Sequence, residues 1–386
     1  MVKYKRIVVK IGSSSLTHDS GKLNLQRIDH FIRQLVDLKN QGREVIFVTS
    51  GAVGAGMGAL GMKDRPQLIP EQQAAAAVGQ AQLMAVYNRF LREYGEIGAQ
   101  ILLTAGDLEN RQRYLNAYNT MTCLLRRGVI PIINENDTVA TEEIKFGDND
   151  TLSALVAGMA DAELLIILSD IDGLYDGDPR QNSAAKKIDK VERISPQIEA
   201  LAKGRGSRLG TGGMQTKISA AKIAVNSGII TVIGPAHHEY VIPKIVAMLE
   251  HGNDYSIGTT FLPGVYALSK RKHWLMYGQN ASGTLVVDEG AEEALLVRGK
   301  SLLPGGIVAV EGSFQHGDLV KVVNEKGALV GKGLVNYSSA EIDQIKGRHS
   351  REIDSILGFS CGADVIHRDN LAVSCEIVNS AKEEKQ

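Results

Sequence analysis

The 386-residue chain contains little cysteine, with Cys123, Cys361 and Cys375 as its three thiols. Their number is odd and no two of them have a short paired spacing. This pattern argues against a disulfide framework and against a cysteine-based zinc site. We therefore expect these cysteines to be buried as small hydrophobic residues.

The chain also lacks an excess of either charge, because 43 Lys and Arg residues stand against 44 Asp and Glu residues. Nothing in this balance points to nucleic acid. No run approaches the roughly 18 apolar residues that a membrane-spanning helix needs. The start of the chain, MVKYKRIVVKIG, has neither the apolar stretch nor the cleavage site of a signal peptide, so we expect a cytoplasmic protein.

Short apolar runs alternate with amphipathic helical segments over about 230 residues. A chain of 386 residues is too long for one core, and domain sizes predict two or three units. The alternation predicts an α/β fold, with an open, mostly parallel sheet sandwiched by helices. The predicted strands are residues 6–11, 44–49, 99–103, 129–133, 164–168 and 229–233.

Polar residues and glycines gather where these predicted strands end. In open parallel sheets, ligands bind outside the carboxyl ends of the strands. The sequence therefore predicts a ligand site at that edge of the sheet. The residues concerned are Lys10, Gly12, Ser13, Ser50, Gly51, Thr104, Asn134, Glu135, Asn136, Ser169 and Asp170.

The segment richest in polar groups is residues 131–151, PIINENDTVATEEIKFGDNDT, which joins an apolar strand to an amphipathic helix. So many polar groups between two core-forming elements indicate a binding site. The alternative is a solvated surface loop in which Asp150 or Thr151 caps the following helix. The polar members are Asn134, Asn136, Asp137, Lys145, Asp148, Asn149 and Asp150.

Glycine-rich segments are candidates for a phosphate-binding loop. Residues 54–59, GAGMGA, fit the loose dinucleotide pattern, but an Ala-rich helical run follows where that motif requires a second strand and an acidic residue. A Walker A sequence is absent. Residues 204–217, GRGSRLGTGGMQTK, open into an amphipathic helix with Lys217 in its first turn, so an anion would meet backbone amides and a helix N-terminus. The alternative is a mobile surface loop, and the presence of Lys10 at the end of the first strand argues against it.

The character of the chain changes after about residue 258, where short Gly-punctuated β-like runs predict a separate small β-rich domain. A basic cluster, residues 270–273, precedes these runs. Helical pieces near residues 291–297 and 341–345 interrupt them.

Taken together, these segments resemble the amino acid kinase family, in the branch whose members phosphorylate glutamate. The C-terminal part looks like a PUA domain, so the resemblance covers nearly the whole chain. Its most specific part is FGDNDTLSALVA together with GTGGMQTK, and Ser13 is a small departure, because many relatives carry Thr there. The matching motifs are VVKIGSS (8–14), VTSGAVGAG (48–56), PIINENDTVAT (131–141), IKFGDNDTLSALVA (144–157), SDIDGLYDGDPR (169–180) and GTGGMQTK (210–217).

The resemblance implies ATP-dependent phosphorylation of the γ-carboxylate of L-glutamate to L-glutamyl 5-phosphate, the first step of L-proline biosynthesis. A side-chain carboxylate with a pKa of about 4.3 is already ionised at neutral pH, so the nucleophile needs no general base. Stabilising charge on the transferred phosphoryl group instead calls for lysines, backbone amides and Mg²⁺. We expect Mg²⁺ to be held mainly by ATP, without a direct protein ligand.

Residue roles carried over from the family divide into three groups. Lys10 and Lys217 would flank the β- and γ-phosphates, and Asp150 would orient both lysines, which makes these three the catalytic group. The glutamate site would comprise Ser50, Gly51, Asn134, Asp137, Asp148 and Asn149, with Asp148 near the ammonium group. The nucleotide would contact Lys10, Gly12, Ser13, Ser169, Asp170, Thr211, Gly212, Gly213, Met214, Gln215, Thr216 and Lys217.

The predicted domain limits are 1–260 for the kinase domain, 261–273 for a linker, 274–366 for the PUA-like domain and 367–386 for a C-terminal tail. Expected partners beyond glutamate and ATP are a second copy of the chain in a dimer or tetramer, L-proline as feedback inhibitor, and glutamyl-phosphate reductase.

Two alternatives remain open from the sequence. A sister kinase acting on aspartate, N-acetylglutamate or a nucleoside monophosphate would differ most in residues 134–150. The second alternative is an RNA-binding role of the PUA-like domain. Against it, the basic cluster is short, base-stacking aromatics are sparse and the overall charge is balanced.

Overall fold

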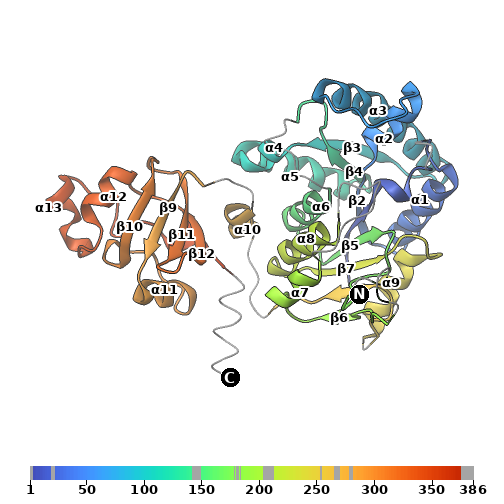
Figure 1. The fold of residues 1–386 in the computed structure, drawn as a ribbon. Coiled ribbons are helices and arrows are strands. Elements are labelled where there is room, and N and C mark those ends of the chain that lie inside the picture. The colour runs from blue at the N-terminus through green and yellow to red at the C-terminus, as the bar shows by residue number, and fades with distance from the viewer. Residues whose placement is uncertain are drawn as a thin grey trace. The chain divides into compact units, whose positions relative to one another are not determined.

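The chain forms two compact units, Met1–Pro263 and Gly264–Gln386 (Figure 1). This computed structural model describes residues 3–18, 22–140, 149–177, 179, 182, 184–202, 213–252, 254–264, 270–277 and 281–374. No helix within these ranges combines the length and apolar character needed to cross a membrane.

An eight-stranded sheet forms the centre of the first unit, in the order β3-β4-β2-β1-β5-β7-β8-β6. Its pairings are parallel, except for the antiparallel pair of β7 with β8. The mostly parallel α/β sheet predicted from the sequence is thus confirmed. The strands are β1 (Arg6–Ile11), β2 (Glu44–Val48), β3 (Gly98–Leu103), β4 (Ile130–Glu135), β5 (Leu164–Ser169), β6 (Lys190–Val191), β7 (Ile230–Pro235) and β8 (Thr259–Phe261).

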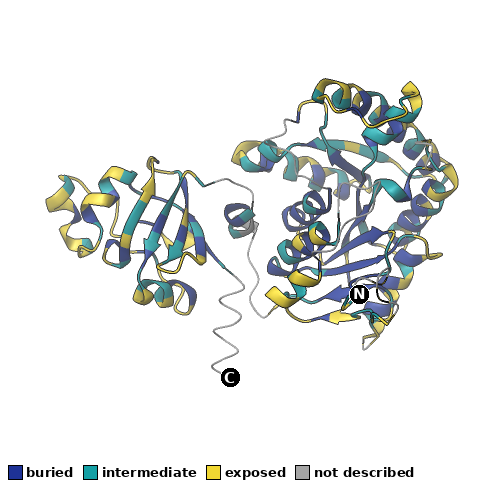
Figure 2. Cartoon of the chain, viewed as in Figure 1, coloured by how far each residue is buried: buried dark blue, intermediate teal, exposed yellow. Residues whose placement is uncertain are grey.

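Helices lie on both faces of this sheet (Figure 1), and the strands between them are largely buried (Figure 2). The helices are α1 (Leu25–Asn40), α2 (Ala52–Leu60), α3 (Ile69–Glu93), α4 (Ala105–Glu109), α5 (Arg111–Arg126), α6 (Asn149–Met159), α7 (Pro196–Leu201), α8 (Met214–Asn226) and α9 (Val241–His251). A short 3-10 helix, η1 (Ser13–Ser15), follows β1.

The alternation of side chains along β1 decides which face each residue serves. Ile7, Val9 and Ile11 belong to one hydrophobic core with residues of α1, α3 and α9. Because successive strand side chains point to opposite faces, Val8 and Lys10 point to the other face, and α6 contacts β1. Lys10 therefore enters the structure on the α6 side of the sheet.

Two glycines allow α2 and α3 to approach very closely. A Cβ atom on Gly56 would lie 1.7 Å from the backbone oxygen of Ala75, and one on Gly79 would lie 1.8 Å from the backbone oxygen of Ala52. No side chain fits at either position. The GAGMGA segment is thus helical and packed, and the dinucleotide-loop interpretation is wrong for it.

The second unit contains a five-stranded sheet in the order β10-β9-β11-β12-β13 with a hydrophobic core of its own. This confirms the predicted small β-rich domain. Its strands are β9 (Gly283–Val287), β10 (Ile307–Gly312), β11 (Leu319–Asn324), β12 (Leu329–Leu334) and β13 (Leu371–Val373). Its helices are α10 (Lys270–Tyr277), α11 (Glu289–Leu296), α12 (Ser339–Ile345) and α13 (Ile353–Leu357), with 3-10 turns η2 (Pro304–Gly306), η3 (Ser350–Glu352) and η4 (Arg368–Asn370).

Regular structure extends into the stretches that we predicted as linker and tail. Helix α10 begins at Lys270 and contacts β12 and β13. Strand β13 pairs antiparallel with β12, with Gly331 opposite Val373. The folded part of the second unit is therefore longer at both ends than residues 274–366.

The expectation of buried cysteines is wrong for the two that the structure describes, because Cys123 and Cys361 are exposed. Cys123 lies on α5, whose buried residues are Tyr114, Met121 and Leu125. At about 100° per residue, position 123 falls on the opposite side of that helix. Cys375 lies outside the described residues.

The close approach of α2 and α3 predicts a sharp contrast between two neighbouring glycines. Gly56→Ala should lower the free energy of unfolding by about 3 kcal/mol, because the added methyl group overlaps a backbone oxygen. Gly54→Ala is the matched control, since no atom lies within 4 Å of its added Cβ, and it should stabilise the helix by about 0.5–1 kcal/mol. Urea denaturation measures both values. Equal effects of the two substitutions would contradict this packing.

Candidate active site

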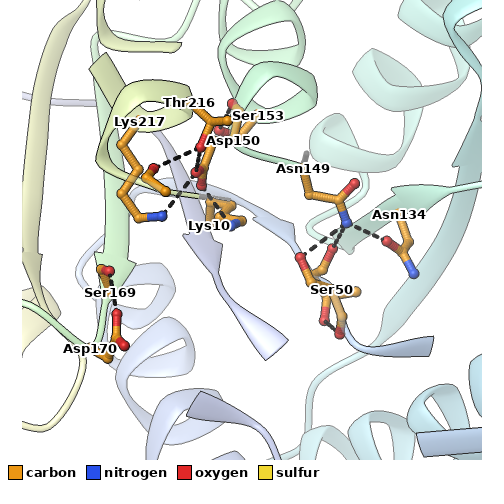
Figure 3. A network of polar contacts seen from close by, with 12 residues as sticks. Lys10, Ser50, Asn134, Asn149, Asp150, Ser153, Ser169, Asp170, Thr216 and Lys217 are labelled. Carbon is orange, nitrogen blue, oxygen red and sulfur yellow. Dashed lines mark hydrogen bonds and ion pairs between the residues drawn. The ribbon is translucent and has the colours of Figure 1, made fainter. Parts of the chain in front are cut away.

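Two lysines share one buried carboxylate at the carboxyl edge of the large sheet (Figure 3). Lys10 Nζ lies 2.6 Å from Asp150 Oδ1, and Lys217 Nζ lies 3.1 Å from Asp150 Oδ2. Asp150 has no exposed surface, while Lys10 and Lys217 are 3% and 6% exposed. Two positively charged side chains thus contact one buried negative charge.

Three separate elements supply the lysine cluster. Lys10 extends from the end of β1, Asp150 lies in the first turn of α6, and Lys217 lies in the first turn of α8. Thr216 Oγ1 also donates to Asp150 Oδ2 over 3.1 Å. The carboxylate thus fixes β1 to the beginnings of two helices. Neither Asp150 nor Thr151 is the helix N-cap, because α6 already includes Asn149, and Asp150 is buried; the loop before the helix, residues 141–148, lies outside the described residues.

A second polar cluster lies on the other side of the α6 N-terminus (Figure 3). The amide nitrogen of Asn149 contacts the Thr49 carbonyl oxygen at 2.6 Å, Ser50 Oγ at 3.1 Å and Asn134 Oδ1 at 2.6 Å. Asn134 donates in turn to Gln80 Oε1 over 2.8 Å. This cluster joins the ends of β2 and β4 to α3 and α6 in one hydrogen-bonded network.

The network has a buried support beneath Ser50. The Thr49 hydroxyl and the Tyr87 hydroxyl lie 2.6 Å apart, and both residues are fully buried. Burial raises the pKa of Tyr87, and its hydrogen bond with Thr49 opposes part of that rise. Tyr87 therefore stays neutral and holds the Thr49–Ser50 backbone in place.

Further predicted residues lie at the same edge of the sheet. Ser169 ends β5, and its hydroxyl donates to Asp170 Oδ1 over 3.0 Å. Gly51 has a positive φ of 96°, which favours glycine, and a Cβ there would lie 3.4 Å from Ser13 Cβ. Gly12 lies near the Lys10 ammonium group, since a Cβ atom added to Gly12 would lie 3.8 Å from Lys10 Nζ. The structure therefore brings β1, β2 and β5 strand-end residues to one region, as the sequence predicted.

The other predicted residues lie in neighbouring segments or outside the described residues. Asp137 is half-buried in a turn after β4, whose Asn136 amide donates to the Leu103 carbonyl. Gly213, Met214 and Gln215 lie at the start of α8. Asp148, Thr211 and Gly212 lie outside the described residues.

Sequence reasoning did not identify Gln80 or Thr49 as members of the site. Gln80 lies within the Ala-rich helix α3 and is far along the sequence from the predicted strand ends. An isolated polar residue in such a helix looks like an ordinary surface residue. Its position directly after the tightly packed Gly79 was the one available signal, because such a glycine places its neighbour close to α2.

Comparisons with known proteins identify the family. Residues 5–234 match the model of the amino acid kinase family, and residues 283–357 match that of the PUA domain. A glutamate 5-kinase from Caldanaerobacter subterraneus subsp. tengcongensis is 53% identical over 368 residues, covering 95% of this chain and 97% of the relative. Glutamate 5-kinases from Carboxydothermus hydrogenoformans (51% over 376 residues, 96% and 97% covered) and Moorella thermoacetica (50% over 369 residues, 96% of each) are also similar.

The chain therefore belongs to the amino acid kinase family, in its glutamate 5-kinase branch, and carries a C-terminal PUA domain. It is a kinase, as the sequence motifs implied.

The shared carboxylate predicts that Asp150 is more important for stability than an ordinary acidic residue. Asp150→Asn should lower the free energy of unfolding by about 3–5 kcal/mol, because it removes the negative charge that both buried lysines contact. Asp150→Asn combined with Lys10→Met should recover part of this loss, since one uncompensated charge is removed. The exposed Asp64→Asn is the control, and we expect it to stay within about 0.5 kcal/mol of the parent protein. Denaturant titration distinguishes these outcomes, and an Asp150→Asn protein as stable as the Asp64→Asn protein would contradict the charge argument.

Proposed function

We propose that the protein transfers the γ-phosphoryl group of ATP to the γ-carboxylate of L-glutamate, giving ADP and L-glutamyl 5-phosphate at the start of L-proline biosynthesis. The observation that carries the proposal is the buried pair of lysines on Asp150, a short distance along α6 from the amide and hydroxyl cluster around Asn149. One half of the site suits phosphates and the other suits a small polar acceptor.

On the phosphate side, the protein has to stabilise charge and exclude water. Lys10 and Lys217 are the donors that would approach the β- and γ-phosphate oxygens, because both ammonium groups meet at one buried carboxylate at the carboxyl edge of the sheet. Asp150 acts as a positioning residue, since it contacts the lysines. Residues 213–217 place the start of α8 beside them, where its amides favour an anion.

On the acceptor side, the substrate carboxylate needs orientation and no general base. It is already ionised at neutral pH, so no histidine or cysteine has to remove a proton. Ser50 and Asn149 offer hydroxyl and amide groups to it, and Asp137 offers a carboxylate to the α-ammonium group. This division explains why the residues in the site are amides, hydroxyls and charged groups.

Mg²⁺ enters this scheme with ATP, where it neutralises charge on the β- and γ-phosphates. The buried carboxylate of the cluster, Asp150, has both oxygens in contact with lysine ammonium groups. It is therefore a poor direct ligand for a second cation. The ion would be held by phosphate oxygens and water.

The reaction is tested by supplying Mg-ATP with L-glutamate, L-aspartate, N-acetylglutamate or UMP. ADP release is followed, and acyl phosphate is trapped with hydroxylamine. We expect γ-glutamyl hydroxamate with glutamate alone. ADP release with another acceptor would overturn the roles of Asp137 and Asn149 while keeping the lysines, and no turnover with any acceptor would overturn the proposal.

The lysine assignment predicts a large effect on turnover. Lys10→Ala and Lys217→Ala should each reduce kcat at least 100-fold, because one preorganised donor to the developing charge is lost. Lys222→Ala is the matched control, since Lys222 lies on the same helix and forms an ion pair with Glu199 at 2.6 Å. Steady-state kinetics on folded variants, checked by circular dichroism, gives the answer. Near-normal kcat in either site variant would reject the phosphate-clamp role.

The acceptor assignment predicts a change in binding. Asp137→Ala should raise the KM for glutamate about 10–100-fold with a smaller effect on kcat, because a charge-assisted hydrogen bond to the ammonium group contributes about 1.5–3 kcal/mol. Thr138→Ala, one residue further and exposed, serves as the control. An unchanged KM for glutamate in the Asp137→Ala protein would remove this residue from the glutamate site.

The same proposal includes three partners. L-proline would compete at the acceptor site, which inhibition kinetics against glutamate would reveal as a rise in KM alone. A homodimer or homotetramer would appear in light scattering. Glutamyl-phosphate reductase would take over the labile acyl phosphate, and failure of the two enzymes to co-elute at high concentration would count against a stable complex. A cytoplasmic location remains a prediction.

RNA binding through the PUA domain receives weaker support. The second unit has a cavity of about 750 Å³ whose charged lining residues are of both signs, Lys300 and Arg368 with His367, against Asp288 and Asp364. Phosphate backbones favour a continuous basic track. Salt-sensitive retention of RNA by the full chain would revive this alternative.

A further inference from the structure

Three potential metal ligands lie close together outside the lysine cluster. Asp172, His237 and His238 each offer one ligand atom, and these atoms all lie within 4.8 Å of one another. The two histidines are exposed and Asp172 is half-buried. The phosphoryl-transfer scheme uses none of the three.

The sheet brings these residues together from distant parts of the chain. Strands β5 and β7 are parallel neighbours, with Ser169 opposite Pro235 at their carboxyl ends. One residue beyond this last strand pair, the backbone amide of Ala236 donates to the Ser169 carbonyl oxygen over 2.6 Å. The turn that carries the histidine pair therefore starts beside the turn that carries Asp172.

The turn after Asp172 is held by strand β8. Gly173 has a φ of 151°, and a Cβ on it would lie 2.6 Å from Thr259 Oγ1. The amide of Leu174 donates to the same hydroxyl group over 2.8 Å, and Thr259 itself is fully buried. The backbone that follows Asp172 is thus anchored to the sheet. This anchoring fixes the position of the turn from which the Asp172 carboxylate extends.

The distances within the group fit shared coordination. His237 Nε2 lies 3.5 Å from Asp172 Oδ1, and two donors bound tetrahedrally at about 2.0–2.1 Å from one ion are about 3.4 Å apart. The rings of His237 and His238 meet edge to face, with centroids 4.7 Å apart at 81°. The side chains of His237 and Asp172 are 51% and 46% exposed, which leaves room for water to complete the coordination.

The donor types decide the kind of ion. Imidazole nitrogen suits Zn²⁺, Cu²⁺, Fe²⁺ and Ni²⁺, whereas Mg²⁺ prefers an all-oxygen environment. Two imidazoles and one carboxylate form a common set of three protein ligands for zinc. We propose that Asp172, His237 and His238 form a binding site for one divalent transition-metal ion such as Zn²⁺. The bound ion would link the turns after β5 and β7.

Direct metal binding to the full chain tests this site without any substrate. Metal-depleted protein carrying Cys123→Ser and Cys361→Ser, which removes two exposed thiols, is titrated with Co²⁺ and then with Zn²⁺. Visible absorption of Co²⁺ and calorimetry with Zn²⁺ report the binding. We expect one ion per chain and a rise in Tm with Zn²⁺, because the ion binds the folded state.

Substitutions locate the ion. Asp172→Asn, His237→Gln and His238→Gln should each weaken Zn²⁺ binding at least 10-fold and abolish the Tm rise. His251→Gln, which changes an exposed histidine at the end of α9, should bind as the parent protein does. Equal affinity in all four variants, or no binding of Co²⁺ or Zn²⁺ below millimolar concentration, would overturn the proposal. These readouts do not depend on turnover, so they stand or fall separately from the kinase reaction.

Discussion

The active-site region depends on one carboxylate that holds two lysines of like charge inside the protein. Without Asp150, the ammonium groups of Lys10 and Lys217 would be buried together and would repel each other. Ion clusters of this kind are a weak source of net stability, because burying each charge costs about as much as the attraction returns. Under the proposed function, the cluster is explained by its two ammonium groups, which would meet the phosphate oxygens of ATP.

The start of α6 links this cluster to the acceptor side. Asn149 and Asp150 are consecutive, and side chains of consecutive helical residues point about 100° apart. One reaches the ends of β2 and β4, and the other reaches β1 and α8. A single helical turn thus sets the spacing between the two halves of the site. A distortion of α6 would disturb the lysine cluster and the Asn149 network together, and under the proposed function these hold the phosphates and the acceptor.

Much of this arrangement could be predicted from the sequence, because it follows local rules. Strand ends in a parallel sheet identified Lys10, Ser50, Asn134 and Ser169, and the position of Lys217 in the first turn of a helix was correct. The pairing of Lys10 with Asp150 joins residues 140 positions apart, and no local pattern predicts it; family resemblance supplied it. Gln80 was missed for the same physical reason, since its partner Asn134 is reached only through tertiary packing. Strand β8, which lies between β7 and the edge strand β6, was missed because three residues carry too little periodicity.

The glycine contact between α2 and α3 extends the same argument to the acceptor site. Gly79 packs against the backbone of Ala52, and Ala52 lies two residues after Ser50. Gln80, the residue after Gly79, accepts a hydrogen bond from Asn134. Packing thus sets the position of both Ser50 and Asn134 relative to Asn149. The amide nitrogen of Asn149 has two hydrogens but three acceptors within 3.1 Å, so its contacts compete. Ser50 Oγ is the most distant acceptor, and under the proposed function a substrate carboxylate would replace it first. Specificity would then depend on whether the substrate has a carboxylate of the right length to take the place of Ser50 Oγ at Asn149, because a shorter or longer acid would not replace that hydrogen bond.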